Sequence, residues 1–128
     1  MNLATATIGQ LSIPVQEFDR GVAFYRDVLG LPFLFAAPPQ MAFFQCGDVR
    51  VLVGAAPAKA ARHAGPALYF RVADIQAVHA TLAVAGVAFV SPPHAVHRTA
   101  TSTLWLAEFT DPDGNALALM CDVPAGAA

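Results

Sequence analysis

Charged residues are scarce in this chain, at 12% of its 128 residues, and the seven Lys and Arg are nearly balanced by nine Asp and Glu. Lys59 is the single lysine, and the arginines are scattered along the sequence. Such a chain has no basic stripe that could neutralise a run of phosphates, so we expect no nucleic acid among its partners. Hydrophobic residues reach 56%, which is not the composition of a disordered chain and predicts a folded protein.

Cysteines and long apolar runs are also few. Cys46 and Cys121 are too isolated for a disulfide framework or a cysteine-based zinc site, which fits a reducing cytosol. No basic residue precedes Arg20, so the basic start of a signal peptide is missing. The longest uncharged apolar stretch, residues 28–44, is interrupted by prolines, a glycine and a glutamine, which excludes a membrane-spanning helix. We expect a cytoplasmic protein that does not interact with a membrane.

The length allows one domain, or two small halves that share a core, and a weak internal repeat favours two halves. Residues 10–15 alternate apolar and polar side chains with the period of a half-buried strand, and residues 67–72 repeat the pattern. A helical stretch follows each strand. Gly30 and Gly86 then supply the left-handed residue that commonly ends a helix.

The two helical stretches have similar faces but different start signals. Asp74 suits the N-cap of the second helix, whereas Glu17 at the matching place is a poorer cap. The predicted buried faces consist of Phe18, Val22, Tyr25 and Leu29 in the first helix and of Ile75, Val78 and Leu82 in the second. The two repeats therefore contain the same kinds of element, but the spacing of their signals differs by one residue.

Each half closes with two strands around a tight turn. The first turn contains Gly47-Asp48 and the second contains Asp111-Pro-Asp-Gly114, in which Pro presets φ and Gly accepts a positive φ. The four strands are predicted over residues 41–45, 49–53, 104–109 and 116–120. Short extra strands are expected over residues 32–36 and 87–90, a linker over about 55–65, and a loop over 91–103.

Two segments of the chain resemble the vicinal oxygen chelate superfamily, which groups glyoxalase I, extradiol dioxygenases, fosfomycin-resistance enzymes and bleomycin-resistance proteins. They are Ile13-Pro-Val-Gln-Glu-Phe-Asp-Arg-Gly-Val-Ala-Phe-Tyr-Arg-Asp-Val-Leu-Gly-Leu31 and Phe109-Thr-Asp-Pro-Asp-Gly-Asn115. The resemblance implies an α+β fold with two βαβββ modules that form a curved mixed sheet around a cleft, and commonly a homodimer. The single domain would span residues 1–128, with modules at about 5–54 and 66–122. It does not imply one reaction, because fold and function are separable.

The resemblance also implies positions for a divalent metal, which enzymes of this superfamily bind through His, Gln or Glu. Those positions hold Gln10, Leu52, Ala67 and Ala118 in this chain. Alanine and leucine offer no donor atom, and a divalent cation needs three or four. We therefore predict no metal in the inherited site and no cofactor. A rebuilt site, in which Gln10 is joined by Glu108 and by His94 or His97, is the open alternative.

Strand alternation predicts which side chains line the cleft, because residues i and i+2 share a face. Leu11, Ile13 and Val15 should face the helix, and so should Leu117 and Leu119 in the last strand. The opposite face then gives the predicted ligand-binding set: Gln10, Ser12, Arg50, Leu52, Ala67, Tyr69, Arg71, His94, Glu108 and Ala118. A mainly apolar wall with a few polar groups is the composition of a small-molecule site.

Two functions follow from this set. The first is a protein that binds or sequesters a small, largely apolar organic molecule, as bleomycin-resistance proteins do, although the net charge of −2 only weakly favours a strongly cationic drug. The second is an enzyme: a glyoxalase-like lyase or dioxygenase with a rebuilt metal site, or a metal-free isomerase with Glu108 or His94 as its base. A simple ion pair between Arg50 and Glu108 is a further interpretation.

Overall fold

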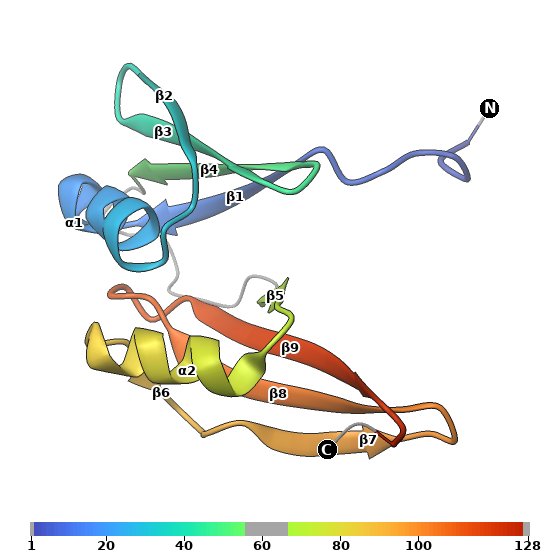
Figure 1. Cartoon of the computed structure of the whole chain (residues 1–128). Coiled ribbons are helices and arrows are strands. Elements are labelled where there is room, and N and C mark those ends of the chain that lie inside the picture. Colours follow the sequence, from blue (N-terminus) through green and yellow to red (C-terminus); the bar gives the residue numbers. More distant parts are fainter. Residues whose placement is uncertain (1, 56–66, 127–128) are drawn as a thin grey trace. The chain divides into compact units, whose positions relative to one another are not determined.

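The computed structural model describes residues 2–55 and 67–126. Contacts within the chain divide it into two compact units, Met1–Ala60 and Ala61–Ala128, and each unit contains one sheet and its helix (Figure 1). Ala55 ends a strand, whereas the rest of the predicted linker lies outside the described residues. None of the helices in the described ranges has the length and apolar character needed to cross a membrane.

The first unit has the order strand, helix, then three strands. Its elements are β1 (Gln10–Val15), α1 (Phe18–Ala23), the π-helix η1 (Phe24–Val28), β2 (Phe33–Ala37), β3 (Met41–Cys46) and β4 (Val49–Ala55). The sheet has the strand order β1-β4-β3-β2. Strand β1 runs parallel to β4, and the other neighbours are antiparallel. This is the predicted mixed sheet.

The second unit repeats this arrangement with one additional strand. Its elements are β5 (Leu68–Arg71), α2 (Ile75–Val84), β6 (Ala88–Phe89), β7 (His94–Arg98), β8 (Ser102–Thr110) and β9 (Ala116–Pro124). The order is β5-β9-β8-β6, β7 also pairs with β8, and β5 runs parallel to β9. Helix α2 packs on β8 and β9 (Figure 1). The predicted α+β fold is confirmed.

The predicted loop over residues 91–103 is wrong in its centre. His94–Arg98 forms strand β7, which pairs antiparallel with β8, and β8 already begins at Ser102. Most of β7 is exposed, so its sequence lacks the alternation of a half-buried strand. Its register also shifts between Ala95 and His97. The Thr99 hydroxyl closes the hairpin by accepting a hydrogen bond from the Ser102 amide at 3.0 Å.

The predicted helix signals are confirmed. The Asp74 side chain accepts a hydrogen bond from the Ala77 amide at 3.1 Å, and Gly30 and Gly86 have φ values of 74° and 95°. Glu17 occupies the N-cap of α1 but makes no capping hydrogen bond within the described part of the chain. One difference is that the first helix changes from α to π geometry at Phe24.

The strands bury the faces that alternation predicts. In β1, Ile13 and Val15 are buried while the alternate residues Gln10, Ser12 and Pro14 are exposed. In β9, Leu117 and Leu119 face the helix side together with Phe109 and Ala107 of β8, as the strand register requires. The remaining side of each sheet, turned away from its own helix, is called its open face below.

Candidate functional site

The open face of the first sheet carries the residues that the sequence assigned to it. Strand register places Gln10 beside Arg50, and Ser12 beside Leu52. Leu52 continues into a row with Phe43 of β3, which pairs with Phe35 of β2. Gln10, Ser12 and Arg50 are exposed and Leu52 is half-buried. All four predicted residues of this unit therefore lie on one surface.

Arg50 is the best-positioned polar group of this surface. Its Nε donates a hydrogen bond to Oε1 of Gln10 at 2.9 Å, and its guanidinium carbon lies 5.5 Å from the centre of the Phe43 ring. Phe43 in turn stacks on Phe35, with ring centres 4.6 Å apart. The arginine is thus held by an amide and an aromatic ring. Gln10 provides its hydrogen-bond acceptor.

The open face of the second sheet gathers the remaining predicted residues in two rows. Tyr69, Ala118 and Glu108 are paired across β5, β9 and β8, so their side chains lie side by side. The next row holds Arg71, Met120, Leu106 and His94. Ala67 is exposed just before β5. Apolar side chains from the central strands are thus flanked by a phenol, a carboxylate and an imidazole.

Glu108 is part of a polar cluster with Ser91 and His94. The Ser91 hydroxyl donates a hydrogen bond to Oε1 of Glu108 at 2.7 Å, and Nε2 of His94 lies 3.7 Å from the same oxygen. On the other side of the imidazole, Nδ1 is 2.8 Å from the carbonyl oxygen of Pro92. Because a carbonyl only accepts hydrogen bonds, Nδ1 is the donor and Nε2 is the nitrogen nearer to Glu108. Sequence reasoning selected Glu108 and His94 but missed Ser91.

Two predicted residues are less available to a ligand than expected. Ala118 lies on the predicted face but is only 1% exposed, because its short side chain sits between the longer side chains of Tyr69 and Glu108. Ala118 therefore offers a ligand almost no surface on this face. Arg71 donates a hydrogen bond to Oδ2 of Asp122 at 2.5 Å, so its charge is already paired.

The comparisons with known proteins agree with this architecture. The family model described as Glyoxalase/Bleomycin resistance protein/Dioxygenase superfamily matches residues 7–119, which is most of the chain. The chain belongs to this superfamily. No curated protein matches it.

Several solved structures share the fold of this superfamily member. A glyoxalase/bleomycin resistance protein/dioxygenase from Nocardioides has a TM-score of 0.77 at 18% identity, over 98% of this chain and 89% of that one. Lactoylglutathione lyase from Agrobacterium tumefaciens has a TM-score of 0.68 at 22% identity, over 91% and 93%. A superfamily member from Sphaerobacter thermophilus DSM 20745 has a TM-score of 0.73 at 23% identity, over 91% and 97%. At these identities the likeness shows the fold alone.

The metal implied by the superfamily does not fit the residues present. Of the four inherited positions, only Gln10 carries a donor, and its Oε1 already accepts a hydrogen bond from Arg50. The adjacent guanidinium would also repel a cation. Among the described residues, no group of three or more His, Cys, Asp or Glu side chains is arranged to hold a metal ion. His97, a candidate for the rebuilt site, is exposed on β7 in register with Leu104.

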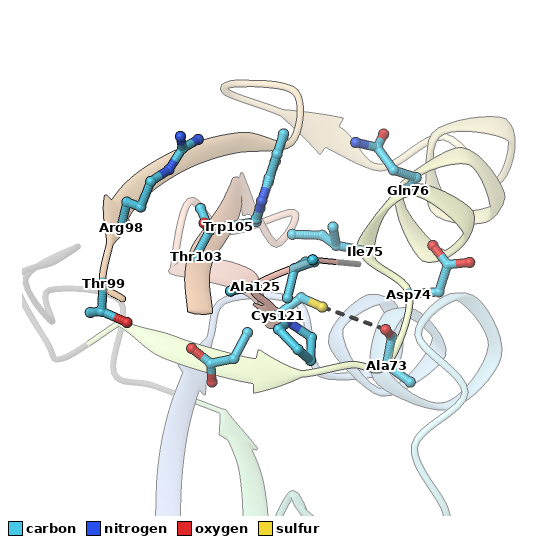
Figure 2. Close-up of a pocket in the computed structure, with 14 residues that line it drawn as sticks. Ala73, Asp74, Ile75, Gln76, Arg98, Thr99, Thr103, Trp105, Cys121 and Ala125 are labelled. Atoms are coloured by element: carbon cyan, nitrogen blue, oxygen red, sulfur yellow. Dashed lines mark hydrogen bonds between the residues drawn. The ribbon is translucent and has the colours of Figure 1, made fainter. Parts of the chain in front are cut away.

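A pocket of about 730 Å³ lies on the other face of the second sheet, where sequence reasoning did not place a site. Figure 2 shows Trp105 and Thr103 of β8, Arg98 of β7 and Ile75 of α2 around it. Cys121 lies in its lining, and its Sγ donates a hydrogen bond to the Ala73 carbonyl at 3.5 Å. Arg98 belongs to the segment that was expected to be a loop, whereas Trp105 and Cys121 are paired on the helix side of the sheet. Trp105, the single tryptophan of the chain, therefore faces away from the open face.

Proposed function

We propose that this protein binds a small, largely apolar organic molecule on its open faces, without the metal of its superfamily. The observation that carries the proposal is the composition of these faces. Half-buried Leu106 and Met120 lie in the rows that Glu108 and His94 flank, and half-buried Leu52 lies beside Arg50. Apolar surface with a few directional polar groups is the usual design of a small-molecule site.

The lost donor set supports binding without metal. Leucine and alanine at three of the inherited metal positions supply no donor atom for a metal ion. At the fourth position, Oε1 of Gln10 already accepts a hydrogen bond from Arg50. An organic ligand would then be held by apolar burial and hydrogen bonds alone. Membership of a superfamily that includes resistance proteins is consistent with such a role.

A thermal-shift screen of apolar compounds followed by calorimetry tests this proposal. For a compound on the second sheet, we expect Leu106→Ala to weaken binding about five- to tenfold, because it removes apolar contact worth roughly 1 kcal/mol. The matched control is Val90→Ala, a residue that is 73% exposed and outside the rows. Circular dichroism checks that both variants fold.

Trp105 locates the bound compound, because its side chain lies on the other face of the same sheet. A compound on the open face should leave its emission spectrum unchanged. A compound that shifts this emission and binds Leu106→Ala normally would move the site to the pocket. That result, or a screen without a single binder, contradicts the proposal.

The Ser91–Glu108–His94 cluster favours a second function, metal-free proton transfer. Glu108 could accept a proton from an acidic C–H bond of a bound compound, while Ser91 keeps its carboxylate in place. The test is exchange of that hydrogen for deuterium in D₂O, followed by NMR. Exchange should be lost in Glu108→Gln and slowed in Ser91→Ala. Exchange that persists in Glu108→Gln would exclude this role.

A further inference from the structure

We propose that the ligand of the first unit's open face is a planar, apolar molecule that carries a carboxylate, and that Arg50 binds this carboxylate. The inference rests on the proposed function and names the chemical class of its ligand. It comes from how Arg50 is held, from the charges around it, and from the aromatic rings beside it.

The hydrogen bond to Gln10 uses only one edge of the guanidinium. Nε is engaged with Oε1 of Gln10, and the two terminal NH₂ groups retain their donors. A guanidinium presents these donors as a planar fork that matches the two oxygens of a carboxylate. Because the Gln10 amide and the Phe43 ring already restrain the side chain, less conformational entropy is lost when an anion binds.

The charge of Arg50 is not balanced by a carboxylate among the described residues of its own unit. Arg26 pairs with Asp27 at 2.9 Å and Arg71 pairs with Asp122 at 2.5 Å. Within the described residues of the first unit, by contrast, no aspartate or glutamate oxygen lies within 4.0 Å of the Arg50 guanidinium. Its side-chain partner is the neutral amide of Gln10. A ligand anion would supply the missing charge.

The aromatic rings beside Arg50 favour a ligand whose remaining part is planar and apolar. Phe43 lies under the guanidinium and stacks on Phe35, which is 46% exposed. Leu52 extends the same row. A planar ring attached to the carboxylate can pack on this aromatic surface while its anion reaches Arg50. A single arginine on an apolar surface fits one carboxylate better than a polyphosphate, which needs several cations.

Calorimetry with three biphenyl compounds tests the inference. The probes are biphenyl-4-carboxylate, its neutral carboxamide and the cationic 4-(aminomethyl)biphenyl, which share the same apolar rings. The wild type should bind the carboxylate at least about tenfold more tightly than the carboxamide, and the amine most weakly.

Two variants should abolish this preference. Arg50→Gln removes the cation, and Gln10→Glu keeps Arg50 but places a carboxylate at its side. Both should bind carboxylate and carboxamide about equally. Arg98→Gln, which removes an exposed arginine from the other unit, is the matched control and should retain the wild-type preference. Unchanged melting temperatures verify folding, and Gln10→Glu carries the test if Arg50→Gln fails to fold.

The outcomes separate this inference from the proposed function. Equal binding of carboxylate and carboxamide by the wild type overturns the inference and leaves small-molecule binding intact. The inference is also overturned if Arg98→Gln loses the preference to the same extent as Arg50→Gln. If no biphenyl compound binds while other compounds of the screen do, the ligand class is wrong. A screen in which no compound binds contradicts both this inference and the proposed function.

Discussion

Gly21 and Val15 approach so closely that a methyl group placed on Gly21 would lie 2.9 Å from Cγ1 of Val15. Val15 is 1% exposed, so its side chain has little room to withdraw. The absence of a side chain at Gly21 therefore allows α1 to pack against the end of β1. This contact holds the helix against one face of the first sheet. Arg50 and its neighbours lie on the opposite side, the open face.

Gly21→Ala should destabilise the protein by up to about 2 kcal/mol, since overpacking costs about 1–3 kcal/mol and the better helix propensity of alanine returns about 1 kcal/mol. Denaturant unfolding measures this change. Gly9→Ala, with nothing within 4 Å of its added methyl group, is the control and should have little effect. The double variant Gly21→Ala/Val15→Ala should lose less stability than the sum of its single changes, and strict additivity would contradict the contact.

Asp111 should be the most sensitive residue of the second hairpin turn. It is 4% exposed, and its Oδ1 accepts hydrogen bonds from the amides of Asp113 and Asn115, both at 2.9 Å. Its Oδ2 accepts a third bond from Nδ2 of Asn115 at 2.7 Å. Asp111→Ala leaves these donors unsatisfied, so we expect a loss of about 2–4 kcal/mol in the free energy of unfolding.

Asp48 offers the matched control for Asp111, because it occupies the turn of the corresponding hairpin and is exposed. Asp48→Ala should change stability by no more than about 0.5 kcal/mol. Equal losses in the two variants would mean that the hydrogen bonds of Asp111 do not stabilise its turn.

Alkaline pH should weaken the fold through Cys46. Burial raises the pKa of its thiol because the charged thiolate is desolvated. A folded-state pKa above the unfolded value means that stability is fully present below about pH 8.5 and is lost as pH rises through the folded pKa. Cys46→Ser should show a smaller decline in unfolding free energy between about pH 8 and 10. Parallel declines in variant and wild type would contradict this role.

We also propose that the chain forms a homodimer, as is common in its superfamily. Phe33 and Leu34 of the edge strand β2 are each 42% exposed, and exposed apolar edges are usually covered in natural proteins. Light scattering at micromolar concentration should give twice the 13.4 kDa mass of the chain. A mass of one chain at that concentration would exclude a stable dimer.

The sequence predicted those parts of the fold that depend on local signals. Alternation assigned Ile13 and Val15 to the core, and the glycine turns located both hairpins, because each signal acts within a few residues. Strand β7 was missed because pairing with β8, and not burial, makes His94–Arg98 a strand. The same error left the strand position of Arg98, which lines the pocket, unpredicted.

Contacts between distant residues limited the prediction of the candidate site. Strand alternation placed Gln10 and Arg50 on one face of the sheet. Only the parallel pairing of β1 with β4 places the two residues side by side in register. Likewise, the burial of Ala118 depends on the length of its neighbours across two strands. The face on which a side chain lies can be predicted from the sequence of its own strand. Its hydrogen-bond partners can be predicted only when the pairing of the strands in the sheet is known.

The π-helical turn at Phe24–Val28 accounts for the one-residue drift between the two halves of the chain. Its Leu29 amide bonds to the carbonyl of Phe24, five residues earlier, at 2.9 Å. The segment from Glu17 to Gly30 is one residue longer than that from Asp74 to Gly86, and a π turn accommodates one extra residue within a helix. The first helix therefore accommodates one more residue than the second between its N-cap and its terminal glycine.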